Sequence, residues 1–346
     1  MRKFFLLLAV LGMAAPCMFA GGSRNRSTSP DTTLRVAVIP VISSLPIHYI
    51  VEKGWDVENG FKIEKIVFSS GAPMGEALVS NLWDIGIMSA AGVFAAANYD
   101  AMCIADSSDT IGFRGLGLFV RPGSDILSVR GGNPSYPNVY GSAETVRGKT
   151  VLCPTGTVSQ LHTLKWLEAL GLESTDVRLV HMEFAQAYQA YLAGQGDIVA
   201  LNPPFCFMAP NEGLIDIAPI DELGVKLNDM VFANKRSIDS KRELINKCLG
   251  LIYRAGMELE ANQAAKEAAL KDWYRVNGSD VDDATVAREA AKKLFSLDDI
   301  RAMNVKGGET LISTAEFFAG IGTVETSKLP VVRGNINGEF IRALLE

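Results

Sequence analysis

A serine and a histidine raise the first chemical question in this sequence. Ser159 and His162 lie in VLCPTGTVSQLHTLKWLEAL (151–170), which is typical of a buried strand, a turn with one glycine and a helix. Residues at this spacing can meet on one helix face, so a nucleophile with its base is one hypothesis. The turn GTVSQ (156–160) lacks the G-x-S-x-G spacing of a nucleophile elbow, and no acid is placed in sequence to orient the imidazole. The pattern favours binding over catalysis.

Other reactive clusters are weak. The chain has only three histidines, which argues against a zinc site, and no Walker loop. Its Lys and Arg are scattered and its formal net charge is −6, which argues against nucleic-acid binding. The run DSSD (106–109) lacks the glycine and glutamate offsets of a calcium loop, so we expect a turn or polar crossover there. We expect no metal and no cofactor.

The first residues predict export. Arg2 and Lys3 precede the apolar run 4–13 and then small residues, the layout of a secretory signal. We expect a signal peptide over 1–20 with cleavage near Ala20, followed by a flexible linker over 21–32. Lipid attachment at Cys17 is the alternative. Either route predicts a periplasmic or extracytoplasmic protein.

Four cysteines follow the signal, and their pairing cannot be read from the sequence. They are widely spaced, contain no C-x-x-C pair and allow three full pairings. An exported protein permits disulfides, but these spacings fit buried free thiols equally well. We expect no structural disulfide. The cysteines are Cys103, Cys153, Cys206 and Cys248.

Residues 34–91 and 148–204 share one layout. Each has an apolar strand ending at a proline, a small-residue turn, a helix with a histidine eight residues past that proline, a second strand and helix, and a third strand opened by Asp-Ile. Strands alternating with helices imply parallel sheets with right-handed crossovers, and two copies imply two lobes. A repeated histidine is easier to explain by packing than by catalysis. The matching positions are Pro40 and Pro154, His48 and His162, Asp84-Ile85 and Asp197-Ile198.

The order of these segments predicts the domain organisation. We expect lobe 1 to begin with 33–120, lobe 2 to span 121–228, and the chain to return to lobe 1 over 229–346, with a strand at 229–233. From Ser240 onward apolar residues recur at helical spacing, which predicts a helical C-terminal segment. We interpret that segment as a packed scaffold without chemistry.

The strand ends predict where a ligand would lie. In open parallel sheets, ligands bind beyond the carboxyl ends of the strands, where helix starts present unpaired N–H groups. Any one Ser or Thr there is equally well explained as a helix N-cap, so it is the repetition in both lobes that favours a crevice. The predicted loops contain Ser43, Ser44, Ser69, Ser70, Gly71, Ser89 and Ala90 in lobe 1, and Thr155, Gly156, Thr157, Glu183, Asn202 and Pro203 in lobe 2.

Three further motifs carry a family resemblance. They are FSSGAPMGEALVSNLWDIG (68–86), ETVRGKTVLCPTGTVSQLHTLKWLEALGLESTDVRLV (144–180) and AYQAYLAGQGDIVALNPPF (187–205). In this order the chain resembles the substrate-binding proteins of ABC importers, in the branch for nitrate, sulfonate, taurine and thiamine precursors. The resemblance implies an α/β, two-lobe periplasmic-binding-protein fold of the type II kind. Each lobe would be a mainly parallel sheet flanked by helices, with hinge crossovers and a helical C-terminal segment.

The resemblance also implies a function. The chain would be an extracytoplasmic solute receptor that hands its ligand to a permease with its ATPase; we expect a monomer, and not an enzyme. Family members often have an aromatic or acidic residue where Asn202 stands, so the ligand does not transfer by analogy. The family's ligand loops fall on Ser43, Ser44, Ser69, Ser70, Gly71, Ala72, Ser89, Ala90, Gly156, Thr157, Asn202 and Pro203.

Several ligand classes fit these residues. Hydroxyls and helix N–H groups favour a sulfonate, taurine or nitrate-like anion, and Glu183 would suit the ammonium group of a zwitterion. A pyrimidine, thiamine precursor or other heteroaromatic is the alternative. Two other functions remain open: a sensor domain, and an enzyme of the thiamine-pyrimidine synthase type, whose clustered cysteines are reduced here to Cys206. The candidate stacking residues are Trp83, Phe184, Tyr188 and Phe205.

Overall fold

The computed structural model describes residues 32–109, 115–303 and 307–346. The predicted signal peptide, 1–20, and residues 21–31 of the predicted linker lie outside the described residues. Among those that are described, no helix is both long enough and apolar enough to cross a membrane.

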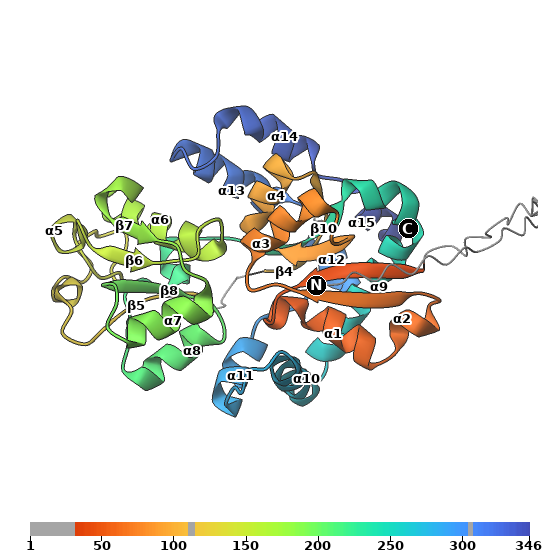
Figure 1. Cartoon of the computed structure of the whole chain (residues 1–346), viewed down its shortest axis with the longest axis horizontal. Helices are drawn as coiled ribbons and strands as arrows, with labels where there is room; N and C mark the ends of the chain where they lie inside the picture. The colour runs from red at the N-terminus through yellow and green to blue at the C-terminus, as the bar shows by residue number, and fades with distance from the viewer. Residues whose placement is uncertain (1–31, 110–114, 304–306) are drawn as a thin grey trace, which may run out of the picture. The chain divides into compact units, whose positions relative to one another are not determined.

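The first sheet combines the first repeat with one strand from later in the chain. β1 (Thr33–Val38) lies between β2 (Lys62–Val67) and β3 (Ile85–Met88) and runs parallel to both. β10 (Asn228–Asn234) pairs antiparallel with β3 and with β4 (Ala101–Asp109). The order is β2-β1-β3-β10-β4, with β10 the one reversed strand (Figure 1).

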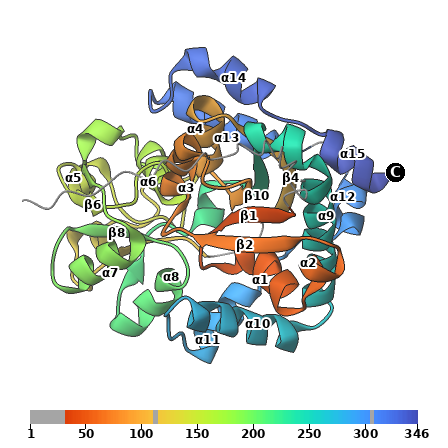
Figure 2. The ribbon, with the colours of Figure 1, turned by 45° about the vertical axis from the view of Figure 1, so that its right-hand side comes forward.

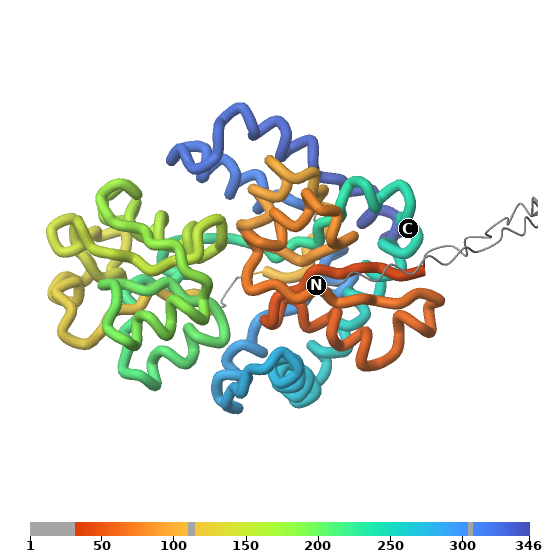
Figure 3. The backbone as a smooth tube through the Cα atoms, viewed as in Figure 1, coloured from red at the N-terminus to blue at the C-terminus, as the bar shows by residue number. Residues whose placement is uncertain are grey.

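The second sheet repeats this plan. β6 (Thr150–Leu152) lies parallel to β7 (Arg178–Val180) and β8 (Ile198–Leu201). β5 (Gly117–Val120) pairs antiparallel with β8 and β9 (Ile215–Asp216), which gives the order β7-β6-β8-β5-β9. The reversed strand of each sheet, β10 in the first and β5 in the second, is the strand with which the chain enters from the other sheet. The chain therefore passes between the sheets twice (Figure 3).

Two predictions about this region differ from the structure. Residues 117–120 were placed with lobe 1, but as β5 they lie in the second sheet, since a short apolar strand does not reveal which sheet it joins. Of the two alternatives predicted for 106–109, a turn or a polar crossover, the turn is wrong because β4 continues through Asp109. Its buried polar groups have partners there: Ser108 Oγ donates to Asp229 at 2.6 Å, and Asp106 accepts from the Asn228 amide at 3.1 Å.

Helices cover both faces of each sheet (Figures 1 and 2). On the first sheet, α3 and α4 pack with α13 and α14 on one face, while α1 packs with α9 and α10 on the other. On the second sheet, α6 lies on one face and α7 with α8 on the other. The α-helices are α1 (Leu45–Glu52), α2 (Trp55–Glu58), α3 (Gly71–Glu76), α4 (Ala91–Asn98), α5 (Ala143–Val146), α6 (Val158–Ala169), α7 (Phe184–Leu192), α8 (Phe205–Met208), α9 (Lys235–Glu260), α10 (Gln263–Val276), α11 (Asp283–Ala290), α12 (Leu297–Met303), α13 (Glu309–Gly320), α14 (Leu329–Gly334) and α15 (Glu339–Leu345). The 3₁₀ helices are η1 (Ile42–Ser44), η2 (Ala77–Ser80), η3 (Asp125–Ser128), η4 (Ser174–Asp176), η5 (Ala209–Glu212), η6 (Ile220–Leu223) and η7 (Thr326–Lys328).

Alternation along the strands divides the core into layers. Successive side chains of a strand point to opposite faces of its sheet. Accordingly, Val36 and Val38 join the cluster under α1 and α9, whereas Ala37 between them joins the cluster under α3 and α4. In the second sheet Val151 and Leu152 divide in the same way, with Leu152 in the cluster that contains α7 and α8 residues. Because both faces are covered, β3 (IGIM), β5 (GLFV) and β8 (IVAL) are apolar and buried throughout.

The repeated Asp-Ile pair has the same structural role in both sheets. The Arg35 N–H donates to the Asp84 carboxylate at 2.8 Å, and the Thr150 N–H donates to that of Asp197 at 2.7 Å. Each aspartate N–H returns a bond to the carbonyl of the same partner residue. Each aspartate thus fixes the start of the third strand beside the first.

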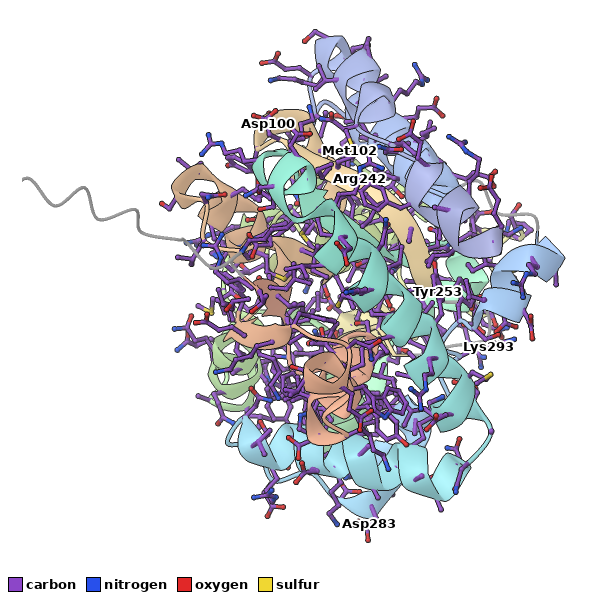
Figure 4. All side chains as sticks on the ribbon, turned by 90° about the vertical axis from the view of Figure 1, so that its right-hand side faces the viewer. Asp100, Met102, Arg242, Tyr253, Asp283 and Lys293 are labelled. Carbon is purple, nitrogen blue, oxygen red and sulfur yellow. The ribbon has the colours of Figure 1, made fainter. Side chains whose placement is uncertain are left out.

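The long helix α9 joins the C-terminal helices to the first sheet. Figure 4 shows Arg242 and Tyr253 at successive places along it. The Tyr253 hydroxyl donates to the Asp106 carbonyl of β4 at 2.8 Å, and the Arg242 guanidinium lies 4.8 Å from the ring centre of Phe340 on α15. The backbone departs from helical geometry at Lys241, whose ammonium group donates to Asp84 at 3.0 Å. The predicted C-terminal helices are confirmed.

Candidate functional site

Two cavities lie beyond the carboxyl ends of the parallel strands. They share a wall of four residues, which places them next to each other. The smaller measures about 70 Å³ and is called here the Lys292 cavity; the larger measures about 180 Å³ and is called the Glu183 cavity. Both take walls from both sheets, so together they form one crevice. The shared wall is Ile39, Val41, Asn202 and Pro203.

The Lys292 cavity contains hydroxyls and a buried ion pair. Ser43 follows β1, and Ser89 follows β3, so each hydroxyl arrives from a strand end. The Lys292 ammonium group, from the turn after α11, forms an ion pair with Asp229 of β10. Both side chains are buried, and Ser108 donates a further hydrogen bond to Asp229. This paired charge keeps a cation on the cavity wall without leaving it isolated in the interior.

The Glu183 cavity combines a carboxylate with aromatic walls. Glu183 precedes the first residue of α7, Phe184, and both line the cavity with Phe205 and Tyr274. Glu183 Oε1 accepts a hydrogen bond from Ser70 Oγ at 3.4 Å, a contact between the two sheets' loops. Its other oxygen, Oε2, is buried and has no hydrogen-bond partner among the described residues. The same holds for Oδ1 of Asn202, whose residue is 9% exposed.

A buried carboxyl group supports the crevice floor. Glu289 of α11 accepts a hydrogen bond from the Ile42 N–H at 2.7 Å and another from the Tyr274 hydroxyl. Burial raises the pKa of Glu289 to about 7, although the Tyr274 hydrogen bond acts to lower it. Since Ile42 and Tyr274 line different cavities, one carboxyl group connects the two.

Comparison with known proteins identifies the family. No family model matches the chain. A curated relative from Brachyspira hyodysenteriae, assigned as an ABC transporter periplasmic binding protein, is 38% identical over 339 residues, covering 97% of this chain and 95% of the relative. This chain is an ABC-transporter periplasmic binding protein. As a member of that family, it binds a small solute outside the cytoplasm and works with a membrane permease and its ATPase.

Solved structures agree on the fold of this binding protein. The alkanesulfonate-binding protein SsuA from Xanthomonas axonopodis pv. citri, bound to MOPS, aligns with a TM-score of 0.67 at 20% identity, over 89% of this chain and 99% of that one. The nitrate-binding protein NrtA from Synechocystis PCC 6803 aligns with a TM-score of 0.66 at 13% identity, over 90% of this chain and 88% of that one. The predicted two-sheet periplasmic-binding-protein fold is confirmed.

The binding protein brings part of the predicted site together on the cavity walls. Ser43 and Ser89 line the Lys292 cavity, Ser69 and Glu183 line the Glu183 cavity, and the Asn202-Pro203 pair lines both. These come from five different strand-end loops, as the strand-end rule predicts. The Pro203–Pro204 peptide bond is cis.

The other residues predicted for the lobe 1 site pack in the interior or hydrogen-bond locally and do not line either cavity. Ser44 is fully buried and accepts the Ile39 N–H at 3.2 Å, and Ala90 is fully buried as well. A Cβ on Gly71 would lie 2.6 Å from that of Ala91, so this glycine allows α3 and α4 to pack closely. Ser70 reaches the crevice only through Glu183.

The predicted turn of lobe 2 uses its polar groups locally. Thr157 accepts from the Ser159 N–H at 3.3 Å, as the N-cap of α6, and donates to the Pro154 carbonyl at 2.6 Å. The Gly156 N–H donates to Gln160, and the Thr155 N–H donates to His181. A Cβ on Gly156 would lie 3.4 Å from that of Ala72, so the two loops meet across the crevice. These residues border the crevice and line neither cavity.

The Ser159–His162 pair is not a catalytic pair. His162 Nε2 donates a hydrogen bond of 2.6 Å to the Ala218 carbonyl, and Ser159 Oγ is buried with no hydrogen-bond partner in the described ranges. Burial lowers the pKa of His162 to about 4. Its counterpart His48 is also buried, between Lys65 at 3.0 Å and Asp272 at 3.0 Å. Both histidines pack inside their lobes.

The sequence interpretation missed the contribution of the C-terminal helices. Tyr274, Ser279 and Lys292 line the crevice, although this segment was interpreted as a scaffold without chemistry. They lie near helix ends with no motif around them, and only the packing of α10 and α11 against α1 and α8 brings them to the strand ends. Of the predicted stacking residues, Phe184 and Phe205 line the crevice, whereas Trp83 is fully buried and donates to the Met74 carbonyl at 2.8 Å.

Proposed function

We propose that this binding protein holds a small oxyanion-bearing solute between its two sheets, in the Lys292 and Glu183 cavities. The observation that carries the proposal is that Asn202 and Pro203 line both cavities, so the two cavities lie side by side at the strand ends. Serine hydroxyls, the start of α7 and the Lys292 cation all lie on its walls, and such groups suit an oxyanion.

The cavity size supports a solute of few atoms. The Glu183 cavity of about 180 Å³ and the Lys292 cavity of about 70 Å³ are both smaller than the roughly 300–1,000 Å³ pockets that hold drug-sized ligands. That matches a short sulfonate or a nitrate-like anion. The sulfonate- and nitrate-binding proteins among the structural neighbours agree with this class.

The remaining expectations complete the proposal. The protein acts by binding alone, as a monomer. It reaches its compartment through the signal at 1–20, with cleavage near Ala20 or a lipid anchor at Cys17. Closure of the sheets on the solute would create the form that docks on the permease.

The test is a thermal-shift screen of the purified protein against alkanesulfonates, taurine, nitrate and pyrimidines. A solute present at 100 times its Kd adds about 2.7 kcal/mol to the free energy of unfolding. Asn202→Ala should abolish the shift, whereas Ser327→Ala, at an exposed position outside the crevice, should preserve it. A shift that survives Asn202→Ala unchanged places the solute elsewhere, and a response to pyrimidines alone replaces the oxyanion class with the heteroaromatic one.

A further inference from the structure

We propose that the solute of this binding protein carries an amine, held as an ammonium group by Glu183 and Asn202. This inference rests on the proposed function, because it assigns a chemical group to the solute in the same crevice. It makes the solute a short zwitterion rather than a simple anion.

The first observation is a pair of unused acceptors on one cavity. Within the part of the chain that the structure describes, Glu183 Oε2 and Asn202 Oδ1 are both buried without hydrogen-bond partners, and both residues line the Glu183 cavity. A buried acceptor left unpaired costs about 1–3 kcal/mol, and more when it is charged. An ammonium group has three donors and no acceptor, so a single amine can satisfy both oxygens.

The second observation concerns the charge of Glu183. Within the described residues, its one cationic candidate is His181, whose Nε2 lies 3.8 Å from Oε1. The Thr155 N–H donates to His181 Nδ1 at 3.1 Å, so Nδ1 is an acceptor. At 3.8 Å the imidazole makes no hydrogen bond to Glu183, and the other contact of Oε1 is the uncharged Ser70 hydroxyl, so no Lys or Arg of the described residues pairs with this carboxylate.

The third observation is the position of the cation already in the crevice. Lys292 is engaged by Asp229 and lines the other cavity. The Glu183 cavity therefore has a carboxylate that no Lys or Arg of the described residues pairs, whereas the Lys292 cavity has hydroxyls and the Lys292–Asp229 ion pair, whose charges balance. A solute with an amine at one end and an oxyanion at the other fits this distribution. Phe184 and Phe205 line the Glu183 cavity, where they would contact the short carbon chain of such a solute.

The experiment compares matched solutes that differ only in the amine. Isothermal titration of taurine against ethanesulfonate, and of β-alanine against propionate, should show the amine-bearing member binding at least tenfold more tightly. In Glu183→Gln, which keeps the shape and removes the charge, that preference should fall to less than threefold. Glu144→Gln, at an exposed position on α5, should keep it. Circular dichroism melting of each variant checks that it is folded.

The outcomes separate the two proposals. If ethanesulfonate or propionate binds as tightly as its amine-bearing partner, the amine inference fails and the oxyanion proposal stands. If the preference for the amine persists unchanged in folded Glu183→Gln, the inference also fails, because the carboxylate is not its source. If no solute of either kind binds, the proposed function and this inference fail together.

Discussion

Glu289 should make the stability of this protein depend on pH in a predictable direction. Burial raises its pKa to about 7 from an ordinary value of 4.5. Because the folded state holds this proton more tightly than the unfolded chain, its stabilising effect is complete below pH 4.5 and is lost as the pH rises through about 7. Each pKa unit is worth about 1.36 kcal/mol, so the loss amounts to about 3 kcal/mol. Glu289→Gln cannot ionise at this position, so the variant should not show this pH-dependent loss of stability.

The assay is urea unfolding of the wild type and Glu289→Gln at several pH values from 4 to 8. Subtracting the two curves removes the other groups, including His162, whose lowered pKa of about 4 acts in the opposite direction. The free energy of unfolding of Glu289→Gln relative to wild type should rise by about 3 kcal/mol across this range. In Tyr274→Phe the change should move to higher pH, because the lost hydrogen bond acted to lower the pKa of Glu289. A difference that stays constant with pH would refute the reasoning.

Two further predictions test the scaffold that positions the crevice. Burial alone would raise the pKa of Asp84, but hydrogen bonds from Arg35 and neighbouring donors lower it from 3.8 to about 2. Asp84 therefore contributes about 2 kcal/mol to the free energy of unfolding above pH 4, and this contribution is lost between pH 4 and 2. Asp84→Asn should flatten this part of an acid-unfolding curve, and an unchanged slope would contradict the prediction. On α9, a Cβ at Gly256 would lie 2.3 Å from the Phe295 carbonyl, so Gly256→Ala should lower the free energy of unfolding by about 1–3 kcal/mol. A Cβ at Gly250 would lie 3.6 Å from its nearest neighbour, so Gly250→Ala should raise it by up to about 1 kcal/mol. Equal urea midpoints for the two variants would count against close packing at Gly256.

The repeat was visible in the sequence because it is local. A strand, a turn and a helix follow one another within about 20 residues, so their periodicities and punctuation can be read directly. The Asp-Ile pairs are the best case. Asp84 and Asp197 were matched by spacing alone, and each accepts the backbone N–H of the first strand of its repeat. A repeated position of this kind has the same neighbours in both sheets, so sequence similarity carries structural meaning.

The residues that line the crevice were only partly predictable, because the crevice is built from segments far apart in the sequence. The strand-end rule selects loops, but it cannot say which polar groups the loop itself consumes. The hydroxyls of Thr157 and Ser44 hydrogen-bond to the backbone around them. Among the described residues, Glu183 Oε2 and Asn202 Oδ1 have no hydrogen-bond partner. Lys292 could not be found at all, because its partner Asp229 lies 63 positions away and no motif marks either residue. Such pairings depend on how α11 folds back over the sheet.

The position of α11 also bears on how the crevice would open and close. Glu289 of α11 accepts a hydrogen bond from the Ile42 N–H, and Lys292 in the turn after α11 forms an ion pair with Asp229. These contacts attach α11 to the first sheet. Toward the second sheet it makes a hydrogen bond of 3.3 Å from Arg288 to the Phe207 carbonyl.

Direct contacts between the two sides of the crevice are individually weak. They include that bond, the Ser70–Glu183 hydrogen bond and the Lys165 ammonium group 3.8 Å from the Phe317 ring centre. At about 0.5–1.5 kcal/mol each, these three supply about 1.5–4.5 kcal/mol together. Moving a two-state equilibrium from 1:99 to 99:1 requires about 5.5 kcal/mol. These contacts alone fall short of a complete shift, and the proposed solute, by pairing the unused oxygens of Glu183 and Asn202 in a closed form, would supply the missing difference.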